Sequence, residues 1–494
     1  MPGSESLVQI LYAGAEINPA ATAVESFDGN ITFEELIGRV ESTGAALHGL
    51  LPTPGSRVAL CGSNNADHLV AYLAILISGF VWVPLNPANG RPLNTRIMMK
   101  ARPDLVLVDR ASIDRAPQTD RLRELRTLRA DSRAFEPTHA SGDDVAAIKF
   151  TGGTSGEPKG VIQTHGNMLA VIENMQAFYQ FKRSDCNLAV APLTHGSSHY
   201  VLPVLGAGGR HRFLRDHSAA AILAAMRDDT TITFMPPTLI YKLLKTTGLT
   251  PELFPHLRHL TYSAAPMPSD KIVEAQRAFG PRISSLYGQT EAPMTICALG
   301  VDEMQDAALR GTAGRPCKNS NVRIVDETDA EVAVGITGHI EVRGPIVMKA
   351  YLDEPEMTAM TINDGWLRTG DLGSLDRSGN LTLSGRASEV IITGGFNVYP
   401  AEIENVLARA PGVRECCVYS TDDSYWGERI EAAIVSDAGC EIAEEQILNF
   451  VRQELGPVRT PKALHRVDAL PRNAVGKVVR RDIARLVESG SGAT

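Results

Sequence analysis

The sequence predicts an α/β fold with two parts: a large N-terminal unit of parallel α/β sheets plus a small β subdomain, and a small α+β C-terminal domain. Strand-like apolar runs alternate with helical patterns over roughly the first 300 residues, which is typical of parallel sheets covered by helices. From about residue 320 the pattern changes to short β segments, and a compact α+β pattern follows Gly385. A length of 494 residues is enough for two to four domains.

The first elements follow this alternation. The capping-box pattern Thr32-Phe33-Glu34-Glu35 precedes spaced apolar residues and predicts an amphipathic helix. Residues 57–61 are expected to form a strand, 66–78 a helix and 80–83 another strand. Residues 110–143 are rich in Arg and Asp with little apolar periodicity, which predicts a solvated excursion from the fold.

A glycine-rich stretch follows this excursion. The apolar run at 145–150 predicts a buried strand, and the spacing from Met168 to Phe178 predicts a helix. Between them, residues 151–160 read TGGTSGEPKG, in which glycines turn backbone N–H groups inward and Lys159 adds a charge, as a polyphosphate requires. Pro158 separates the glycines from Lys159, so the Walker pattern is not matched. Taken alone, such a run of Gly, Ser and Thr is more often a flexible surface loop.

The later elements complete the two parts. Strand-like runs lie at 187–191, 232–235, 259–262 and 283–287, with helical stretches between them. Short β segments at 322–325, 339–343 and 381–383, with a turn at 376–380, predict the β subdomain. A helix from Pro400, strands near 415–420 and 430–436, and a helix containing Ile447, Leu448 and Val451 predict the C-terminal domain.

Composition excludes several classes of protein. The net charge of −9 argues against general nucleic-acid binding, and 44% hydrophobic with 21% charged residues is ordinary for a globular chain. The seven cysteines are scattered and lack a C-x-x-C pair, which favours neither disulfides nor zinc and indicates a reducing compartment. The most hydrophobic stretch, 69–83, contains Ser78 and Gly79 and is short for a membrane span. We therefore expect a cytoplasmic protein without a membrane span.

A series of motifs runs in order over nearly the whole chain. They lie at 151–160, 192–196, 263–266, 287–291, 311–316, 338–344, 366–371, 385–386, 394–404 and 471–477. No single motif is decisive, but the ordered set resembles the adenylate-forming superfamily of acyl-CoA synthetases, peptide-synthetase adenylation domains and luciferases. The resemblance implies an adenylating domain at 1–385, a hinge at 386–388 and a mobile C-terminal domain at 389–494.

The resemblance implies an AMP-forming acid:CoA ligase that uses ATP, Mg²⁺ and coenzyme A. A carboxylate must approach the negatively charged α-phosphate of ATP, so charge has to be neutralised around the reacting atoms. Lys477 resembles the family's catalytic lysine, which bridges the carboxylate and the α-phosphate. Thr290 resembles the hydroxyl residue on that phosphate, Glu291 the acid that holds Mg²⁺, and His195 the residue that orients the carboxylate.

Nucleotide binding is implied for further motif residues. Tyr287 would stack on adenine, the 263–266 segment would follow the edge of the base, Asp371 would accept from the ribose hydroxyls, and Arg386 would add a cationic donor. The full implied set is Thr151, Gly152, Gly153, Thr154, Ser155, Gly156, Lys159, Ser263, Ala264, Ala265, Pro266, Tyr287, Gly288, Gln289, Thr290, Asp371 and Arg386. Taken alone, the Thr-Gly-Asp at 369–371 is typical of a turn, and a lone histidine is more often merely packed.

The second half of the reaction concerns the thiol. The residues implied for coenzyme A are Gly394, Gly395, Trp426 and Lys462, and Ser388 stands at the hinge where the family usually has Asp or Lys. The stretch 452–481 is rich in Lys and Arg and could meet the phosphates of coenzyme A or be a solvated basic face. The acyl pocket is implied between the segments 197–205, 234–241 and 292–296.

Several alternatives stay open at this point. The acid is expected to be an aryl or short- to medium-chain acid, but its identity does not follow from the sequence. The acceptor could be the phosphopantetheine of a carrier protein, and a non-catalytic ligand-binding homologue is a further alternative. The expected partners are the acid and coenzyme A, without nucleic acid, and the chain is expected to be a monomer or homodimer.

Overall fold

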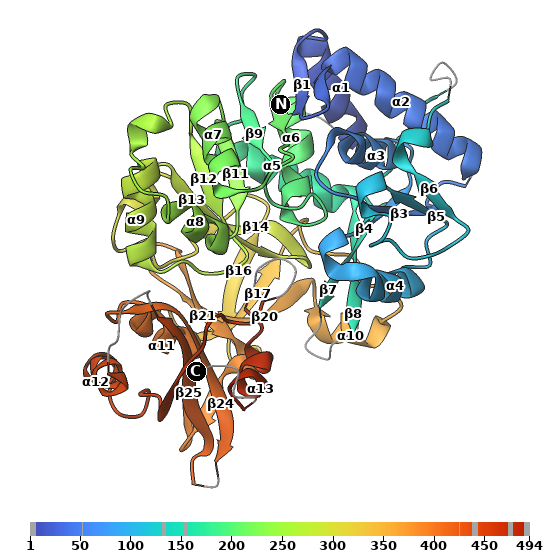
Figure 1. Cartoon of the computed structure of the whole chain (residues 1–494). Coiled ribbons are helices and arrows are strands. Elements are labelled where there is room, and N and C mark those ends of the chain that lie inside the picture. Colours follow the sequence, from blue (N-terminus) through green and yellow to red (C-terminus); the bar gives the residue numbers. More distant parts are fainter. Residues whose placement is uncertain are drawn as a thin grey trace.

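The fold consists of a large unit and a smaller C-terminal unit (Figure 1). The computed structural model describes residues 6–51, 53–130, 135–152, 157–423, 425–436, 443–472 and 478–488. These residues form a nine-stranded, a seven-stranded and a five-stranded sheet in the large unit, and another five-stranded sheet in the C-terminal unit. The α/β class and the division into a large and a small part are as predicted.

The nine-stranded sheet is parallel in its centre and antiparallel at its edges. Its strands, in spatial order, are β15 (Arg315–Pro316), β14 (Ala292–Leu299), β13 (Ile283–Gln289), β12 (His259–Tyr262), β11 (Ile232–Met235), β9 (Cys186–Leu188), β10 (Arg210–Arg212), β1 (Thr22–Ser26) and β2 (Gly29–Thr32). Neighbours from β13 to β1 are parallel, whereas β14, β15 and β2 pair antiparallel. The helices between its strands include α7 (Ala219–Asp228), α8 (Pro237–Leu244) and α9 (Ser269–Phe279).

The seven-stranded sheet carries the glycine-rich stretch. Its spatial order is β18 (Ala350–Tyr351), β8 (Pro158–Thr164), β7 (Val145–Gly152), β4 (Val81–Leu85), β3 (Arg57–Cys61), β5 (Leu105–Val108) and β6 (Leu122–Glu124). The helices of this part of the chain are α1 (Leu7–Ile17), α2 (Phe33–Leu50), α3 (Ala66–Ile77), α4 (Gly90–Ala101), α5 (His165–Tyr179) and α6 (Val201–Gly206). The capping box of α2 forms as predicted, since the Thr32 hydroxyl accepts from the Glu35 N–H and the Glu35 carboxylate accepts from the Thr32 N–H.

One prediction for this region is wrong. Residues 110–143 were expected to be a solvated excursion, but β6 within them extends the sheet, and Leu125 and Leu128 are buried in the core. Residues 131–134 lie outside the described part. The stretch 69–83 is a buried helix that leads into a buried strand, as expected. In the described part of the chain, no helix is long and apolar enough to cross a membrane.

The predicted β subdomain closes the large unit. Its sheet has the order β16 (Asn321–Val325), β17 (Gly338–Arg343), β20 (Trp366–Leu375) and β19 (Ile362–Asn363), and β21 (Leu381–Arg386) also pairs with β20. Helix α10 (Pro355–Thr361) precedes β19. The turn predicted at 376–380 forms, with the Asp376 carboxylate accepting from the N–H groups of Ser378 and Asn380.

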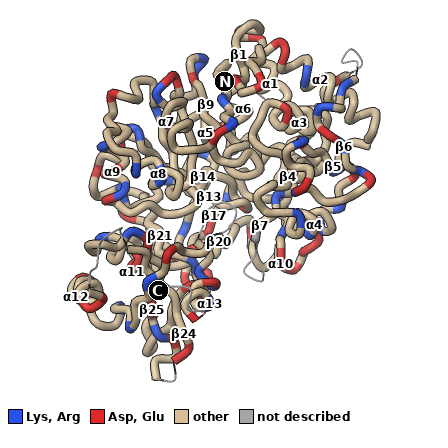
Figure 2. Tube along the Cα trace, in the orientation of Figure 1, with Lys and Arg blue, Asp and Glu red and all other residues tan. Residues whose placement is uncertain are grey.

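The C-terminal unit has its own core around a separate sheet. Its strands are β23 (Phe396–Val398), β22 (Ile391–Thr393), β25 (Gly427–Ser436) and β24 (Val413–Asp423), with β26 (Ala463–Arg466) beside β25, and its helices are α11 (Pro400–Leu407), α12 (Glu444–Leu455) and α13 (Ile483–Glu488). The tip of the β24–β25 hairpin points away from the large unit (Figure 1). Basic and acidic residues are interspersed along the trace of both units (Figure 2).

Candidate active site

The predicted nucleotide residues gather where the three sheets of the large unit meet. The turn between β13 and β14 brings Thr290 and Glu291 from the nine-stranded sheet. The β7–β8 hairpin brings Thr151 and Lys159, which are opposite each other in the register of the seven-stranded sheet. Strands β20 and β21 bring Asp371 and Arg386 from the β subdomain. Residues far apart in the sequence are thereby placed around one site.

Asp371 is the centre of the first cluster. It lies opposite Arg386 in the β20–β21 register, and the Arg386 Nε forms an ion pair with Asp371 Oδ1 at 2.9 Å. The Tyr287 hydroxyl donates to Asp371 Oδ2 at 2.6 Å and so links two of the sheets. Burial and the adjacent Asp371 carboxylate raise the pKa of Tyr287 well above its usual value. The three predicted residues therefore form one connected group, and Thr-Gly-Asp belongs to a strand rather than a turn.

Glu291 is the centre of the second cluster. The Tyr351 hydroxyl donates to Glu291 Oε1 at 2.9 Å, and the backbone carbonyl of Glu291 accepts from the Met348 N–H. The Lys159 amine lies 5.9 Å from the centre of the Tyr351 ring. Among the described residues, Glu291 has no ion-pair partner, so its carboxylate is suited to a cation. Mg²⁺ commonly takes one or two protein carboxylates and completes its shell with phosphate and water.

Another group of possible metal ligands lies elsewhere in the large unit. Glu25, Cys186 and Asp229 come within ligand distance of one another. The two carboxylates are already in ion pairs with Arg210 and Arg212. These contacts show that the group is an ion-pair network that joins β1 to β10. Glu291 is therefore the better candidate for a metal ligand.

The glycine-rich stretch connects two antiparallel strands. Gly152 at the end of β7 lies opposite Pro158 at the start of β8, and α5 begins only after β8. This differs from the expected direct passage from strand to helix, because β8 was not recognised in the sequence. Residues Gly153, Thr154, Ser155 and Gly156 lie outside the described part. The described ends of the loop are next to Lys159, which fits a phosphate-binding loop.

The 263–266 segment follows the carboxyl end of β12. Ser263 is buried, whereas Ala264 is exposed and has a φ of +72°. This left-handed conformation is unfavourable for a residue with a Cβ atom and is concentrated at functional sites in proteins. Its place at the end of a parallel strand is also where α/β sheets commonly bind ligands. Both observations agree with a role at the edge of the base.

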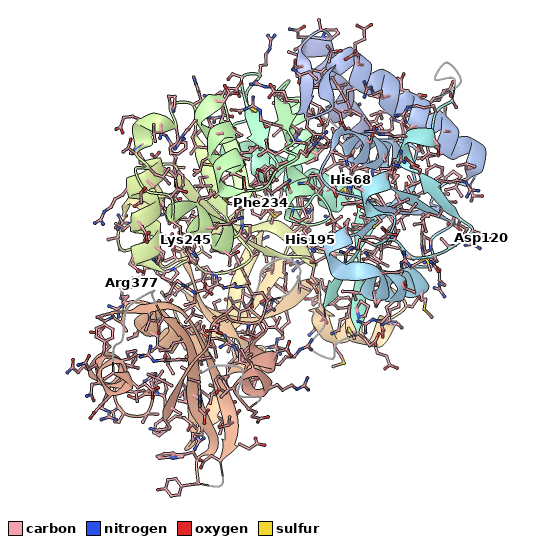
Figure 3. The ribbon with its side chains drawn as sticks, viewed as in Figure 1. His68, Asp120, His195, Phe234, Lys245 and Arg377 are labelled. Atoms are coloured by element: carbon pink, nitrogen blue, oxygen red, sulfur yellow. The ribbon has the colours of Figure 1, made fainter. Side chains whose placement is uncertain are left out.

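His195 lies at the start of η5 (Gly196–Tyr200), in the central part of the large unit near Phe234 (Figure 3). Its Nδ1 is 2.9 Å from the Thr194 hydroxyl. Burial, together with the positive charge of Lys149, lowers the pKa of His195 to about 4. The imidazole is therefore neutral at physiological pH and acts as a hydrogen-bonding group rather than as a cation.

Gly288 packs directly against the backbone of Met294. A Cβ atom at Gly288 would lie 2.4 Å from the backbone nitrogen of Met294, which cannot move without distorting β14. We expect Gly288→Ala to destabilise the protein by about 1–3 kcal/mol through this overlap. Thermal melting would check this. Gly311→Ala is the matched control, because nothing lies within 4 Å of a Cβ there. Equal melting temperatures for the two variants would contradict the expectation.

The four residues implied for coenzyme A form an exposed cluster in the C-terminal unit. The Gly394 N–H donates to the Trp426 carbonyl at 2.8 Å, and a Cβ at Gly394 would lie 3.0 Å from the Trp426 ring. The Lys462 amine lies 5.4 Å from the centre of that ring, and Gly395 follows with a φ of +81°. Trp426 directly precedes β25, in the connection from β24, and the β24–β25 hairpin points away from the large unit (Figure 1).

The connection between the units passes through η8 (Ala387–Glu389), in which Ser388 is exposed. Lys477 lies outside the described part, but Arg472 and Val478 on either side of its segment form an isolated β-bridge. Arg472 forms an ion pair with Glu415 at 2.6 Å, and both residues act electrostatically on Tyr241 of α8 in the large unit. The face that bears the ends of this segment is therefore turned towards the large unit.

Part of the basic stretch 452–481 is neutralised by ion pairs. Arg459 pairs with Glu402, Arg472 with Glu415, and Arg480 with both Glu389 and Glu404. These contacts favour a structural role for the paired arginines over a positive field that attracts phosphates.

Three residues near the site were not predicted from the sequence, namely Tyr351, Lys149 and His199. Only Lys149 had a visible signal, a charged residue inside the apolar run 145–150.

Comparison with known proteins shows that the chain is an adenylate-forming enzyme. Residues 11–352 match the family model described as AMP-binding enzyme, and residues 402–477 match that of the AMP-binding enzyme C-terminal domain. The chain therefore belongs to the AMP-binding enzyme family, in which it is an AMP-forming acid:CoA ligase.

Individual relatives cover nearly the whole chain. A feruloyl-CoA synthase from an Amycolatopsis species is 31% identical over 95% of this chain and 97% of its own length. A 2-succinylbenzoate–CoA ligase from Bacillus cereus is 32% identical, with 98% and 99% covered. The crystal structure of ATP-bound MatB from Rhodopseudomonas palustris has 30% identity and a TM-score of 0.87, covering 97% of this chain and 99% of that one.

Proposed function

We propose that this enzyme activates an aryl or short- to medium-chain carboxylic acid with MgATP and transfers the acyl group to coenzyme A. The observation that carries the proposal is the closeness of the Asp371 cluster and the Glu291 cluster, since Arg386 of the first acts electrostatically on Tyr351 of the second. One cluster offers an oriented carboxylate for hydroxyl donors, and the other offers a carboxylate for a cation beside a lysine. A ribose joined to a metal-bound polyphosphate has this pattern of groups.

The nucleotide would be held from its base to its phosphates. Tyr287, fixed at its hydroxyl by Asp371, would stack on adenine, and the segment from Ser263 to Pro266 would follow the edge of the base. Asp371 would accept from the ribose hydroxyls, with Arg386 keeping it ionised and oriented. The loop from Thr151 to Lys159 would hold the β- and γ-phosphates. Glu291 would hold Mg²⁺, which would neutralise phosphate charge.

In the first half-reaction, an oxygen of the substrate carboxylate attacks the α-phosphorus and pyrophosphate leaves. Neutral His195 would orient the carboxylate, Thr290 would donate to the α-phosphate, and Lys477 would bridge the two. In the second half-reaction, the thiol of coenzyme A attacks the acyl carbon and AMP leaves. Both steps depend on charge neutralisation and placement rather than on a covalent enzyme intermediate.

The second half-reaction would require the C-terminal domain, residues 389–494, to rotate about the hinge at 386–388. The support is geometric, because Trp426 and the Lys462 amine beside its ring, two members of the coenzyme A cluster, belong to the β24–β25 hairpin region, and this hairpin points away from the large unit. Rotation would bring this cluster to the acyl-adenylate and remove the Lys477 face. Ser388 is exposed within the connection, and its side chain forms no hydrogen bond with a described residue.

The choice of acid rests on the relatives. Feruloyl-CoA synthase and 2-succinylbenzoate–CoA ligase are named for aromatic acids, and both resemble this chain over almost its full length. We also infer that the enzyme works in the cytoplasm as a monomer or homodimer. The six described cysteines are free thiols, as a reducing compartment would keep them.

Pyrophosphate release tests the proposed function. Purified enzyme with MgATP is offered benzoates, cinnamates and fatty acids of graded length, with and without coenzyme A. Release that is sustained only with coenzyme A is expected for one group of acids. A single burst that coenzyme A does not extend would indicate a carrier-protein acceptor instead. No release with any acid would contradict the substrate class and favour a binding homologue.

Replacement of Trp426 tests the proposed coenzyme A surface. Trp426→Ala removes the ring that contacts Gly394 and Lys462, so the KM for coenzyme A should rise by about tenfold with little change in adenylate formation. Steady-state kinetics with varied coenzyme A measures this. Phe27→Ala is the control, since its ring is 41% exposed, close to the 39% of Trp426, and lies between β1 and β2 of the large unit. A KM that changes equally in both variants, or in neither, would remove Trp426 from the thiol path.

A further inference from the structure

A buried lysine lies directly behind the turn that carries His195. Lys149 belongs to β7, two residues before Thr151, and only 6% of it is exposed. Its amine is 2.9 Å from His199 Nε2 and 3.3 Å from the Ser198 hydroxyl, and it lies 5.2 Å from the centre of the Trp82 ring. Among the described residues, no carboxylate forms an ion pair with this amine. Its charge is therefore not balanced by the protein around it.

The partners of Lys149 connect it to the active site. Ser198 and His199 both belong to η5, and the Ser198 hydroxyl also donates to the His195 carbonyl at 2.8 Å. Gly196, in the same turn, packs so closely against Met294 and Phe234 that a Cβ there would lie 2.8 Å from the Met294 sulfur. Lys149 thus holds one side of η5, and the other side faces the implied acyl pocket.

Burial without a counter-ion disfavours the charged amine and lowers the pKa of Lys149 to about 7. The ionisable groups that face it from neighbouring elements are His195 and His199 around η5 and Tyr72 of α3, which lines a small cavity with His199. Burial and Lys149 lower the pKa of both histidines, and burial raises that of Tyr72. Lys149 is therefore the group of this cluster that titrates near neutrality.

We propose that Lys149 is a positioning residue for adenylate formation. Its protonated amine fixes the position of η5, and thereby that of His195. Its charge stabilises the substrate carboxylate and the nucleotide phosphates that bind on the other side of η5. The inference rests on the proposed function, since the carboxylate and the nucleotide phosphates are the missing counter-charge. Two unit charges about 10 Å apart at an effective dielectric constant of about 20 interact strongly enough to change a rate roughly tenfold.

The first test compares wild type with Lys149→Met and Lys149→Gln in acid-dependent exchange of pyrophosphate with MgATP between pH 6 and 9. The ratio of wild-type to variant kcat/KM removes the titration of ATP and of all shared groups. We expect a ratio of about ten at pH 6 that falls, with a midpoint near pH 7, as Lys149 loses its proton. Lys149→Gln keeps a donor for His199 but not the charge, so it should behave like Lys149→Met.

Two results would overturn the inference. A ratio independent of pH would show that Lys149 acts only through packing, and full activity of Lys149→Gln would show that the charge is not needed. Absence of exchange by wild type with every acid is a different failure, because it overturns the proposed function and this inference with it. Lys271→Met, at a lysine of α9 paired with Glu274, is the control and should give a ratio near one at every pH.

Thermal melting gives an independent readout. The unfolded lysine has a pKa of about 10.4, above that of the folded state, so below pH 7 both states are protonated and the folded protein carries the full penalty of the buried charge. Lys149→Met should therefore raise the melting temperature at pH 6 by at least about 2 °C. The gain should shrink between about pH 7 and 10, where the folded amine is neutral. A lower melting temperature at pH 6 would contradict the buried, unbalanced charge.

Discussion

Replacement of Lys477 by alanine is expected to lower the rate of adenylate formation by about 10²–10³-fold, the usual effect of removing a donor to developing negative charge. Thioester formation from a preformed acyl-adenylate should change little, because the bridge between carboxylate and α-phosphate is no longer needed. The residues on either side of its segment support this role, since the Arg472–Glu415 pair acts electrostatically on Tyr241 of the large unit. Lys477 itself lies outside the described residues, and its role stays a prediction.

The two half-reactions have to be measured separately. Acid-dependent pyrophosphate exchange reports the first, and release of AMP from synthetic acyl-adenylate plus coenzyme A reports the second. Lys318→Ala, at an exposed lysine of the large unit, should leave both rates unchanged. Equal loss of both half-reactions in Lys477→Ala would exclude a role confined to adenylation and would indicate a general defect of the C-terminal domain.

Asp371→Asn is expected to lower kcat/KM for ATP by about 10²-fold. The carboxylate is the proposed acceptor for the ribose hydroxyls, and hydrogen bonds to a charged group are each worth about 1.5–3 kcal/mol. The substitution also leaves Arg386 without its ion-pair partner at 2.9 Å, although an amide oxygen can still accept from Tyr287. Initial rates with varied ATP measure the effect, and KM for the acid should change much less.

The control for this variant is Asp376→Asn in the turn between β20 and β21. Asp376 is exposed and accepts turn hydrogen bonds that an asparagine can keep. Both proteins should melt close to the wild-type temperature. An unchanged KM for ATP in Asp371→Asn would place the ribose elsewhere and would separate Asp371 from the nucleotide site.

Much of the fold and part of the site could be predicted from the sequence. Most strands could be located because a parallel strand that is buried on both faces appears in the sequence as a continuous run of apolar residues. The prediction for 110–143 was wrong because β6 is held by backbone pairing with β5, and the buried residues that follow β6, Leu125 and Leu128, show no strand or helix periodicity. Strand β8 was missed for a related reason, since it follows the glycine-rich loop and has no flanking turn of its own.

The site residues were found through ordered motifs, but their contacts were not. Asp371 and Arg386 are cross-strand partners, and only the register of β20 against β21 reveals that pairing. Tyr351 is 60 positions from Glu291 along the chain, and the two meet through the packing of different sheets. Lys149 was visible as a charged residue in an apolar strand. Its role depends on its contact with Ser198 of η5, 49 positions away in the sequence, which the sequence does not reveal.

The meeting of three sheets has a thermodynamic consequence for the whole large unit. A nucleotide that touches Tyr287, Asp371 and Lys159 touches a strand or turn of every sheet in that unit. Its binding energy is lost as soon as any one sheet opens, so occupancy opposes local opening in all of them at once. Bound ligand would thus make the three sheets unfold as a single cooperative unit. The protein without ligand lacks this coupling between its sheets.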